Sequence, residues 1–165
     1  MNRVATTVTT LGASGALVLG LAMPAAAATK TRADKRGDAP ASADITKVAY
    51  HHTKKGVSAT AKVRKLANKG QFVLAIANRS KSLQYGVEAT RKGHTTKQRF
   101  LVNRKGKISR IRCSGMRTVW STKHSAVRIS FPRRCYKPLG TKVLLKIAST
   151  KPFLKTVDGA PTVRF

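Results

Sequence analysis

Acidic residues are scarce in this chain. Its 165 residues include five Asp and Glu against 34 Lys and Arg, which gives a formal net charge of +29 at pH 7. The five acids are Asp34, Asp38, Asp44, Glu88 and Asp158. Glycoside hydrolysis generally needs a pair of carboxylates across one bond, and a calcium ion needs roughly six to eight oxygens, several of them charged. Because so few acids are available, we expect neither a carboxylate catalytic pair nor a metal site.

Residues for metal or nucleophilic chemistry are also few. The four histidines are His51, His52, His94 and His124, and we expect each to be a solvated surface residue. His51 and His52 are adjacent in a strand-like segment, so their side chains point to opposite faces and cannot hold one ion together. No Gly-x-Ser-x-Gly turn marks a nucleophilic serine, and no Lys-Gly turn precedes a helix as in a phosphate-binding loop. We therefore predict a protein without catalytic residues, bound metal or cofactor.

Long apolar runs are missing as well. The run Leu11–Met23 follows Arg3 and precedes Pro24 and four alanines. It is too short for a membrane span of about 20 residues. The order of a positive charge, a short apolar run and small residues is typical of a secretory signal. We therefore predict that residues 1–28 are a cleaved signal peptide and that the protein is secreted, with attachment to the cell envelope as a variant of the same prediction.

The rest of the chain is predicted to form an arm and one domain. Thr29–Ala43 is polar and basic and has no large apolar side chain, so we expect a disordered arm over residues 29–43. From Asp44 onward apolar and polar residues alternate, as in Val57–Arg64 and Leu83–Ala89. Gln71–Ala77 is apolar on both sides, which favours a central strand. We assign residues 44–165 to a single domain.

The pattern predicts an all-β fold. Turn signals recur every 8–12 residues or so, and no segment shows the helical period. We predict an antiparallel β-sandwich of about nine strands, with a small barrel as the alternative. Tyr50, Phe72, Tyr85, Phe100, Trp120 and Phe131 share the apolar positions of their strands, so we expect them in the core.

A β-hairpin is predicted at the centre of this fold. Met116–Trp120 and Val127–Phe131 alternate and are joined by a polar turn, and the hairpin register pairs Trp120 with Val127. The only two cysteines, Cys113 and Cys135, then lie at its open end, about 5 Å apart and within disulfide reach. In this register Cys113 and Cys135 are one residue away from facing each other directly, and a bulge at Ser114 and Gly115 would account for the difference. Two free buried thiols are the alternative, which export to an oxidising compartment disfavours.

The abundant cations suggest the function. Basic residues alternate with apolar ones on several predicted strands, and we expect them to form a cationic sheet face with cationic loops. Such a face attracts polyanions: a cell-wall polymer, nucleic acid without sequence specificity, or anionic lipid. The alternative hypothesis is that the basic residues bind no ligand and only keep the protein soluble. The predicted contact residues are Lys62, Arg64, Lys97, Arg99, Arg110, Arg112, Arg117, Arg133 and Arg134.

Two further functions remain open. Tyr136, beside Arg133 and Arg134, is the aromatic most open to surface contact, and together with Trp120 it could serve a module that binds neutral glycans. An enzyme with a dispersed site is the third hypothesis, which the shortage of carboxylates argues against. We expect a monomer without a transmembrane span.

The sequence of the predicted hairpin and its two cysteines also resembles that of a group of known proteins. Cys113-Ser114-Gly115 precedes a Trp-bearing strand, and Pro132-Arg133-Arg134-Cys135 ends the next one. This pattern resembles small uncharacterised secreted β-sandwich proteins of high-GC Gram-positive bacteria, some of which look distantly like carbohydrate-binding sandwich modules. The resemblance implies the sandwich fold and export, and it carries no assigned activity. The resemblance also implies an Asp-rich loop after the central strand, and Ala77–Ser82 lacks those acids here.

Overall fold

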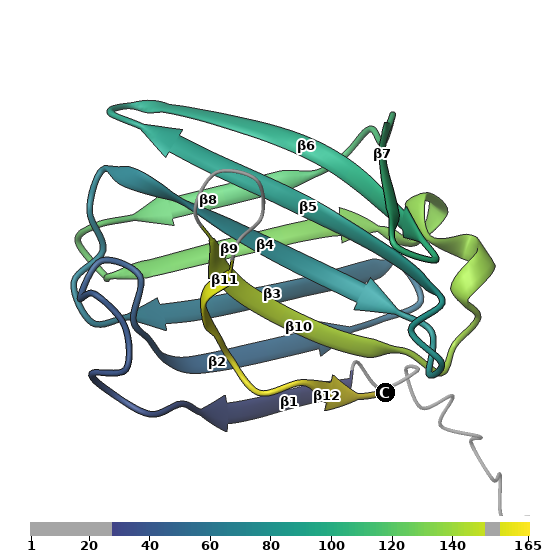
Figure 1. Ribbon diagram of the computed structural model, residues 1–165, viewed down its shortest axis with the longest axis horizontal. Helices are drawn as coiled ribbons and strands as arrows, with labels where there is room; N and C mark the ends of the chain where they lie inside the picture. Colours follow the sequence, from purple (N-terminus) through teal and green to yellow (C-terminus); the bar gives the residue numbers. More distant parts are fainter. Residues whose placement is uncertain (1–27, 151–155) are drawn as a thin grey trace, which may run out of the picture.

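Alternating apolar residues fold this chain into two antiparallel sheets that pack face to face (Figure 1), which confirms the predicted sandwich. The computed structural model describes residues 28–150 and 156–165, so the predicted signal peptide lies outside the described residues except for Ala28. Within the described residues there is no α-helix. No helix in this part of the chain is long and apolar enough to cross a membrane.

The five-stranded sheet has the order β1-β2-β3-β9-β8. Its strands are β1 (Ala28–Ala33), β2 (Ile45–His52), β3 (Gly56–Val63), β9 (Ala126–Pro132) and β8 (Arg117–Ser121).

The seven-stranded sheet has the order β11-β10-β4-β5-β6-β7, with β12 also paired to β10. Its strands are β11 (Thr156–Gly159), β10 (Leu144–Thr150), β4 (Lys69–Ala77), β5 (Leu83–Lys92), β6 (Thr95–Arg104), β7 (Lys107–Ile111) and β12 (Val163–Arg164). The nine strands that the sequence predicts are all present, and β1, β11 and β12 are additional.

The core lies between the two sheets and is filled by the apolar positions of the strands. The apolar alternating residues of β3 and β5 are buried except for Leu83, which is partly buried. The six predicted core aromatics also pack there, with Trp120 only partly buried. Phe100 of one sheet meets Phe131 of the other with ring centroids 5.4 Å apart. Burying side chains of this size contributes about 1.5–3 kcal/mol each, so these contacts hold the sheets together.

The predicted hairpin and disulfide are both confirmed. Trp120 pairs with Val127 in the β8–β9 ladder. Cys113 and Cys135 are bonded, with their Cα atoms 5.7 Å apart. The predicted bulge is wrong: Ser114 and Gly115 form a turn before β8 begins, and Cys135 lies in the 3-10 turn η1 (Arg133–Cys135). A second such turn, η2 (Lys137–Leu139), follows. A disulfide fits an extracellular protein.

The predicted disordered arm is wrong for residues 29–43. Thr29 to Ala33 belong to β1, which pairs with β2 over its whole length, and Asp34–Asp44 then form turns. Ala43 N–H and Asp44 N–H both donate to the Pro40 carbonyl oxygen, at 2.7 and 2.9 Å. Backbone hydrogen bonds to the edge of β2 hold this segment, so it needs no large apolar side chain and gives no apolar signal.

The C-terminal residues that the structure describes cover an edge of the seven-stranded sheet. β11 and β12 pair with β10. β12 lies beside β1 at one edge of the sandwich (Figure 1), and the Lys30 ammonium donates to the Arg164 carbonyl oxygen there. On this side of the sandwich, β1 therefore lies beside β12, and β2 contacts β10 of the other sheet.

Candidate anion-binding surface

The predicted cations do not form one face. Lys62 and Arg117 occupy outward positions of the five-stranded sheet, because the residues that alternate with them face the core. Lys97, Arg99 and Arg110 occupy outward positions of the seven-stranded sheet. These two outer faces lie on opposite sides of the sandwich, so a single ligand-binding face can use only one of the two sets.

Five of the predicted cations have partners within the fold. Lys62 Nζ donates to the His124 carbonyl oxygen at 3.1 Å, and Arg99 Nη1 lies 3.8 Å from Glu88 Oε1. Arg64 Nε lies 2.9 Å from Asp44 Oδ2. The Arg133 guanidinium lies over the Tyr136 ring, 4.9 Å from its centroid. Arg134 donates to the Ser114 carbonyl oxygen at 2.9 Å and to Ser114 Oγ at 3.1 Å. Arg64, Arg133 and Arg134 therefore have structural roles. Arg112, just after β7, is exposed.

Arg128 is a surface cation that the sequence prediction missed. It lies between the buried Val127 and Ile129 on β9, so its side chain faces outward and is exposed. In the ladders Arg128 is opposite Val119, and Arg117 is opposite Ser130. Arg117 and Arg128 are therefore diagonal neighbours, with Cα atoms roughly 7–8 Å apart. The alternation Val127-Arg128-Ile129 is the signal that could have identified this residue.

A groove runs past these two arginines. A hollow of about 420 Å³ is lined in part by His51, Ser58, Arg128 and Ser130. A second hollow of about 250 Å³ is lined by Arg117, Val119, Arg128 and Ser130. The hollows share Arg128 and Ser130, so they form one continuous surface. We call it the arginine groove and define it by His51, Lys55, Ser58, Arg117, Arg128 and Ser130.

The arginine groove offers hydrogen-bond donors and no negative charge. None of its lining residues is acidic. Within residues 28–150 and 156–165, neither guanidinium of Arg117 and Arg128 has an ion-pair or hydrogen-bond partner. Ser130 Oγ donates to the Arg117 carbonyl oxygen at 3.4 Å, and Ser58 is 7% exposed. Guanidinium groups bind phosphate and sulfate in a bidentate manner, so the chemistry of this groove suits such groups.

The histidines at the end of β2 face opposite ways, as the sequence predicts. His51 lines the arginine groove, and His51 Nδ1 lies 2.8 Å from Thr29 Oγ1. His52 packs edge-on against Phe165, with ring centroids 5.5 Å apart. Burial, with a smaller effect of the Arg133 charge, lowers the pKa of His52. The two rings therefore cannot share a ligand.

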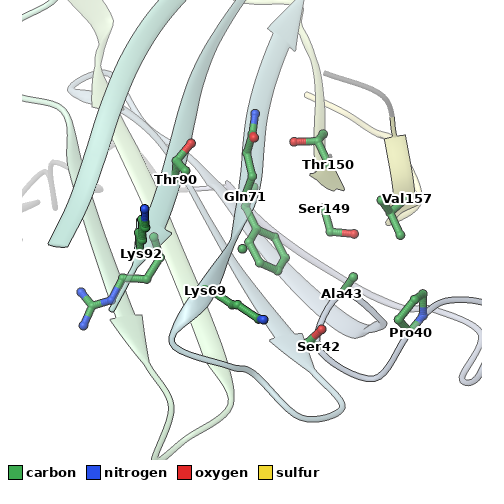
Figure 2. A pocket seen from close by; sticks show the side chains of 13 residues that line it. Pro40, Ser42, Ala43, Lys69, Gln71, Thr90, Lys92, Ser149, Thr150 and Val157 are labelled. Carbon is green, nitrogen blue, oxygen red and sulfur yellow. The ribbon is translucent and has the colours of Figure 1, made fainter. Parts of the chain in front are cut away.

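A larger pocket lies at one end of the sandwich (Figure 2). It has a volume of about 620 Å³, and Phe72 lines it together with Pro40, Ala43 and Val157. The cations among its lining residues are Lys69, Arg91 and Lys92. No histidine or carboxylate is among the described residues that line it, so this pocket offers no general base to its serines and threonines.

The predicted aromatic contacts are not on the surface. Tyr136 is fully buried and packs edge-on against Phe131, with ring centroids 5.4 Å apart, so its predicted surface role is wrong. Trp120 is half-buried: its indole N–H donates to the Ala67 carbonyl oxygen at 2.9 Å, and its ring meets Phe72 edge-on. Neither ring is a free platform on which a sugar could stack.

The structure also collects acids that are far apart in the sequence. Asp34 and Asp44 flank the turns before β2, and Asp158 of β11 reaches the same place, where its Oδ2 accepts a hydrogen bond from Ile45 N–H at 2.6 Å. This edge of the five-stranded sheet is the one opposite β8. The concentration of three acids in residues 34–44 was a signal, but the approach of Asp158 depends on the fold.

Comparisons with protein-family models, curated proteins and solved structures found no match. The resemblance to small secreted sandwich proteins therefore stays a prediction, and the function has to be argued from the surface described above.

Proposed function

We propose that this protein is an exported, non-enzymatic β-sandwich that binds anionic polymers through the arginine groove. The observation that carries the proposal is the pair of exposed guanidiniums, Arg117 and Arg128, without partners in the described part of the chain and beside hydroxyl groups. In a fold where Arg64 and Arg99 pair with carboxylates, cations left free on a groove are available to a ligand.

The ligand class is a polymer with repeated phosphate or sulfate groups. The arginine groove crosses β8, β9 and β3, so successive anionic groups of one chain could meet Arg117, Arg128 and Lys55 in turn. Each phosphate that a cation neutralises releases condensed counterions, and binding of this kind weakens steeply as salt rises. The high net charge of the chain would add long-range attraction. A cell-wall polyanion, a nucleic acid and an anionic lipid surface all share this chemistry.

The test compares two double variants with equal changes in charge. Arg117→Gln with Arg128→Gln removes the free guanidiniums of the groove, and Lys97→Gln with Arg110→Gln removes two exposed cations of the opposite sheet. Binding to a fluorescent single-stranded oligonucleotide is measured by anisotropy at increasing NaCl. We expect the groove variant to lower the slope of log K against log salt by about 1.4, since each phosphate contact on a single strand contributes about 0.7.

The control variant separates a site from diffuse attraction. We expect Lys97→Gln with Arg110→Gln to change the slope by less than about half as much, since those side chains face away from the groove. Equal effects of the two double variants would show that no particular surface binds the polymer, and the proposal would be lost. Retention on a neutral glycan that is insensitive to salt would also contradict it.

A further inference from the structure

Four of the five acids of this chain lie at one place in the fold. Asp34 follows β1, Asp38 lies in the turns after it, Asp44 precedes β2, and Asp158 belongs to β11. Carboxylate oxygens of Asp38, Asp44 and Asp158 all lie within 4.8 Å of one another. Like charges at such distances repel one another, so the cluster needs an explanation in a chain with 34 basic residues.

Backbone amides hold the carboxylates of this cluster in position. Asp158 Oδ2 accepts a hydrogen bond from Ile45 N–H at 2.6 Å. Asp44 Oδ2 accepts one from Gly37 N–H at 2.9 Å and also lies 2.9 Å from Arg64 Nε. Donors that orient a carboxylate through one oxygen and leave the other free are typical of groups that ligate metal ions.

An unpartnered buried oxygen indicates what the cluster lacks. Asp44 is fully buried, and its Oδ1 has no hydrogen-bond partner. Its Oδ2 is taken by Gly37 and Arg64, so Oδ1 is the oxygen left for a ligand shared with Asp38 and Asp158. A buried charged group without a partner is costly. Among the described residues, the pair with Arg64 is the one ion pair made by any of these acids.

We propose that Asp38, Asp44 and Asp158 bind a divalent cation, with Ca²⁺ preferred over Mg²⁺. Carboxylate oxygens are the ligands that both ions take, and Ca–O distances of about 2.3–2.6 Å allow ligand oxygens up to about 5 Å apart. Mg²⁺ requires shorter bonds of about 2.0–2.1 Å in a near-ideal octahedron and gives up its water reluctantly, so a site built from three protein carboxylates suits Ca²⁺ better. Backbone carbonyl oxygens and water complete the coordination.

The proposed ion would join the two sheets. Asp38 and Asp44 lie in the turns that lead into β2 of the five-stranded sheet, and Asp158 lies on β11 of the seven-stranded sheet. Asp34, next to this site, also has a buried oxygen, Oδ2, without a partner. A bound cation would relieve the repulsion among these carboxylates and stabilise the fold.

The experiment measures calcium binding and its effect on stability. The full chain is stripped of metal with EDTA, transferred to phosphate-free buffer and titrated with CaCl₂ by calorimetry. Thermal unfolding is then compared in CaCl₂ and MgCl₂ at equal ionic strength. We expect one Ca²⁺ with a Kd of about 1 mM or tighter, the range of extracellular modules, a Tm that rises with Ca²⁺, and a smaller rise with Mg²⁺.

Two variants with equal changes in charge identify the site. Asp38→Asn removes the exposed carboxylate of the cluster, and Glu88→Gln removes the one acid outside it. We expect Asp38→Asn to weaken Ca²⁺ binding at least tenfold or so, and Glu88→Gln to leave it within about twofold, since distant sites act independently. The proposal is overturned if no Ca²⁺ binds up to about 10 mM, if both variants lose affinity equally, or if CaCl₂ and MgCl₂ stabilise the protein equally.

Discussion

Tyr50 joins the two sheets through its phenol group. Its hydroxyl accepts a hydrogen bond from Ile147 N–H of β10 at 3.1 Å and donates one to the Pro161 carbonyl oxygen at 3.1 Å. The side chain is fully buried, and burial raises the pKa of Tyr50 to about 12. An unfolded tyrosine has a pKa of about 10, so the folded state holds this proton more tightly. The stability that this contributes is fully present below pH 10 or so and is lost as the pH rises through about 12.

Replacing Tyr50 with phenylalanine therefore has two expected effects. At pH 7, Tyr50→Phe loses about 1–3 kcal/mol of unfolding free energy, because the buried Ile147 N–H is left without its acceptor. Between pH 10 and 12, the wild type loses about 2–3 kcal/mol more than the variant, since each unit of pKa shift is worth about 1.4 kcal/mol. Urea unfolding at a series of pH values measures both.

Tyr85→Phe is the matched control for Tyr50→Phe. Tyr85 is also a core tyrosine, but its hydroxyl makes no hydrogen bond within the described residues. We expect Tyr85→Phe to keep the alkaline loss of the wild type. If Tyr50→Phe lost the same stability between pH 10 and 12 as the wild type, the role assigned to the Tyr50 hydroxyl would be wrong.

At the scale of the element, the β8–β9 hairpin is closed covalently at its open end. The disulfide spans a sequence separation of 22 residues. On the chain-entropy model such a bridge contributes about 3 kcal/mol, because it restricts the unfolded chain. We expect Cys113→Ser with Cys135→Ser to lower the unfolding free energy by about that amount in urea while the far-ultraviolet circular dichroism stays that of a β protein. Unchanged stability would contradict this role, as would free thiols in the wild-type protein.

Strands held by apolar burial were predictable from the sequence, and strands held by backbone pairing alone were not. Val57–Val63 alternates and is a strand, whereas Ala28–Ala33 has no alternating apolar residues and still pairs with β2. The residues of the candidate site also differ in whether the sequence alone could predict them. The outward positions of Arg117 and Arg128 could be predicted from the alternation of β8 and β9, but that the two side chains are neighbours follows only from the register of the two strands. The meeting of Asp158 with Asp44 depends on how the two sheets pack.

At the scale of the whole molecule, charge is unevenly distributed. The acids Asp34, Asp38, Asp44 and Asp158 gather beside the start of β2, on the side of the five-stranded sheet opposite β8, whereas Arg117 and Arg128 lie on β8 and β9. The cations have few acids to pair with, so self-repulsion works against the folded state. An anionic polymer on the groove would reduce that repulsion as well as bind, which links the proposed ligand to the stability of the fold.

The most direct test of the anion-binding account is an amide NMR titration with a short single-stranded oligonucleotide. The account predicts that the largest shifts fall on β8 and β9, at Arg117, Val119, Arg128 and Ser130, and that they fade as NaCl is added. Shifts of equal size over the outer faces of both sheets, or shifts centred on Lys97–Arg99 of β6, would contradict it.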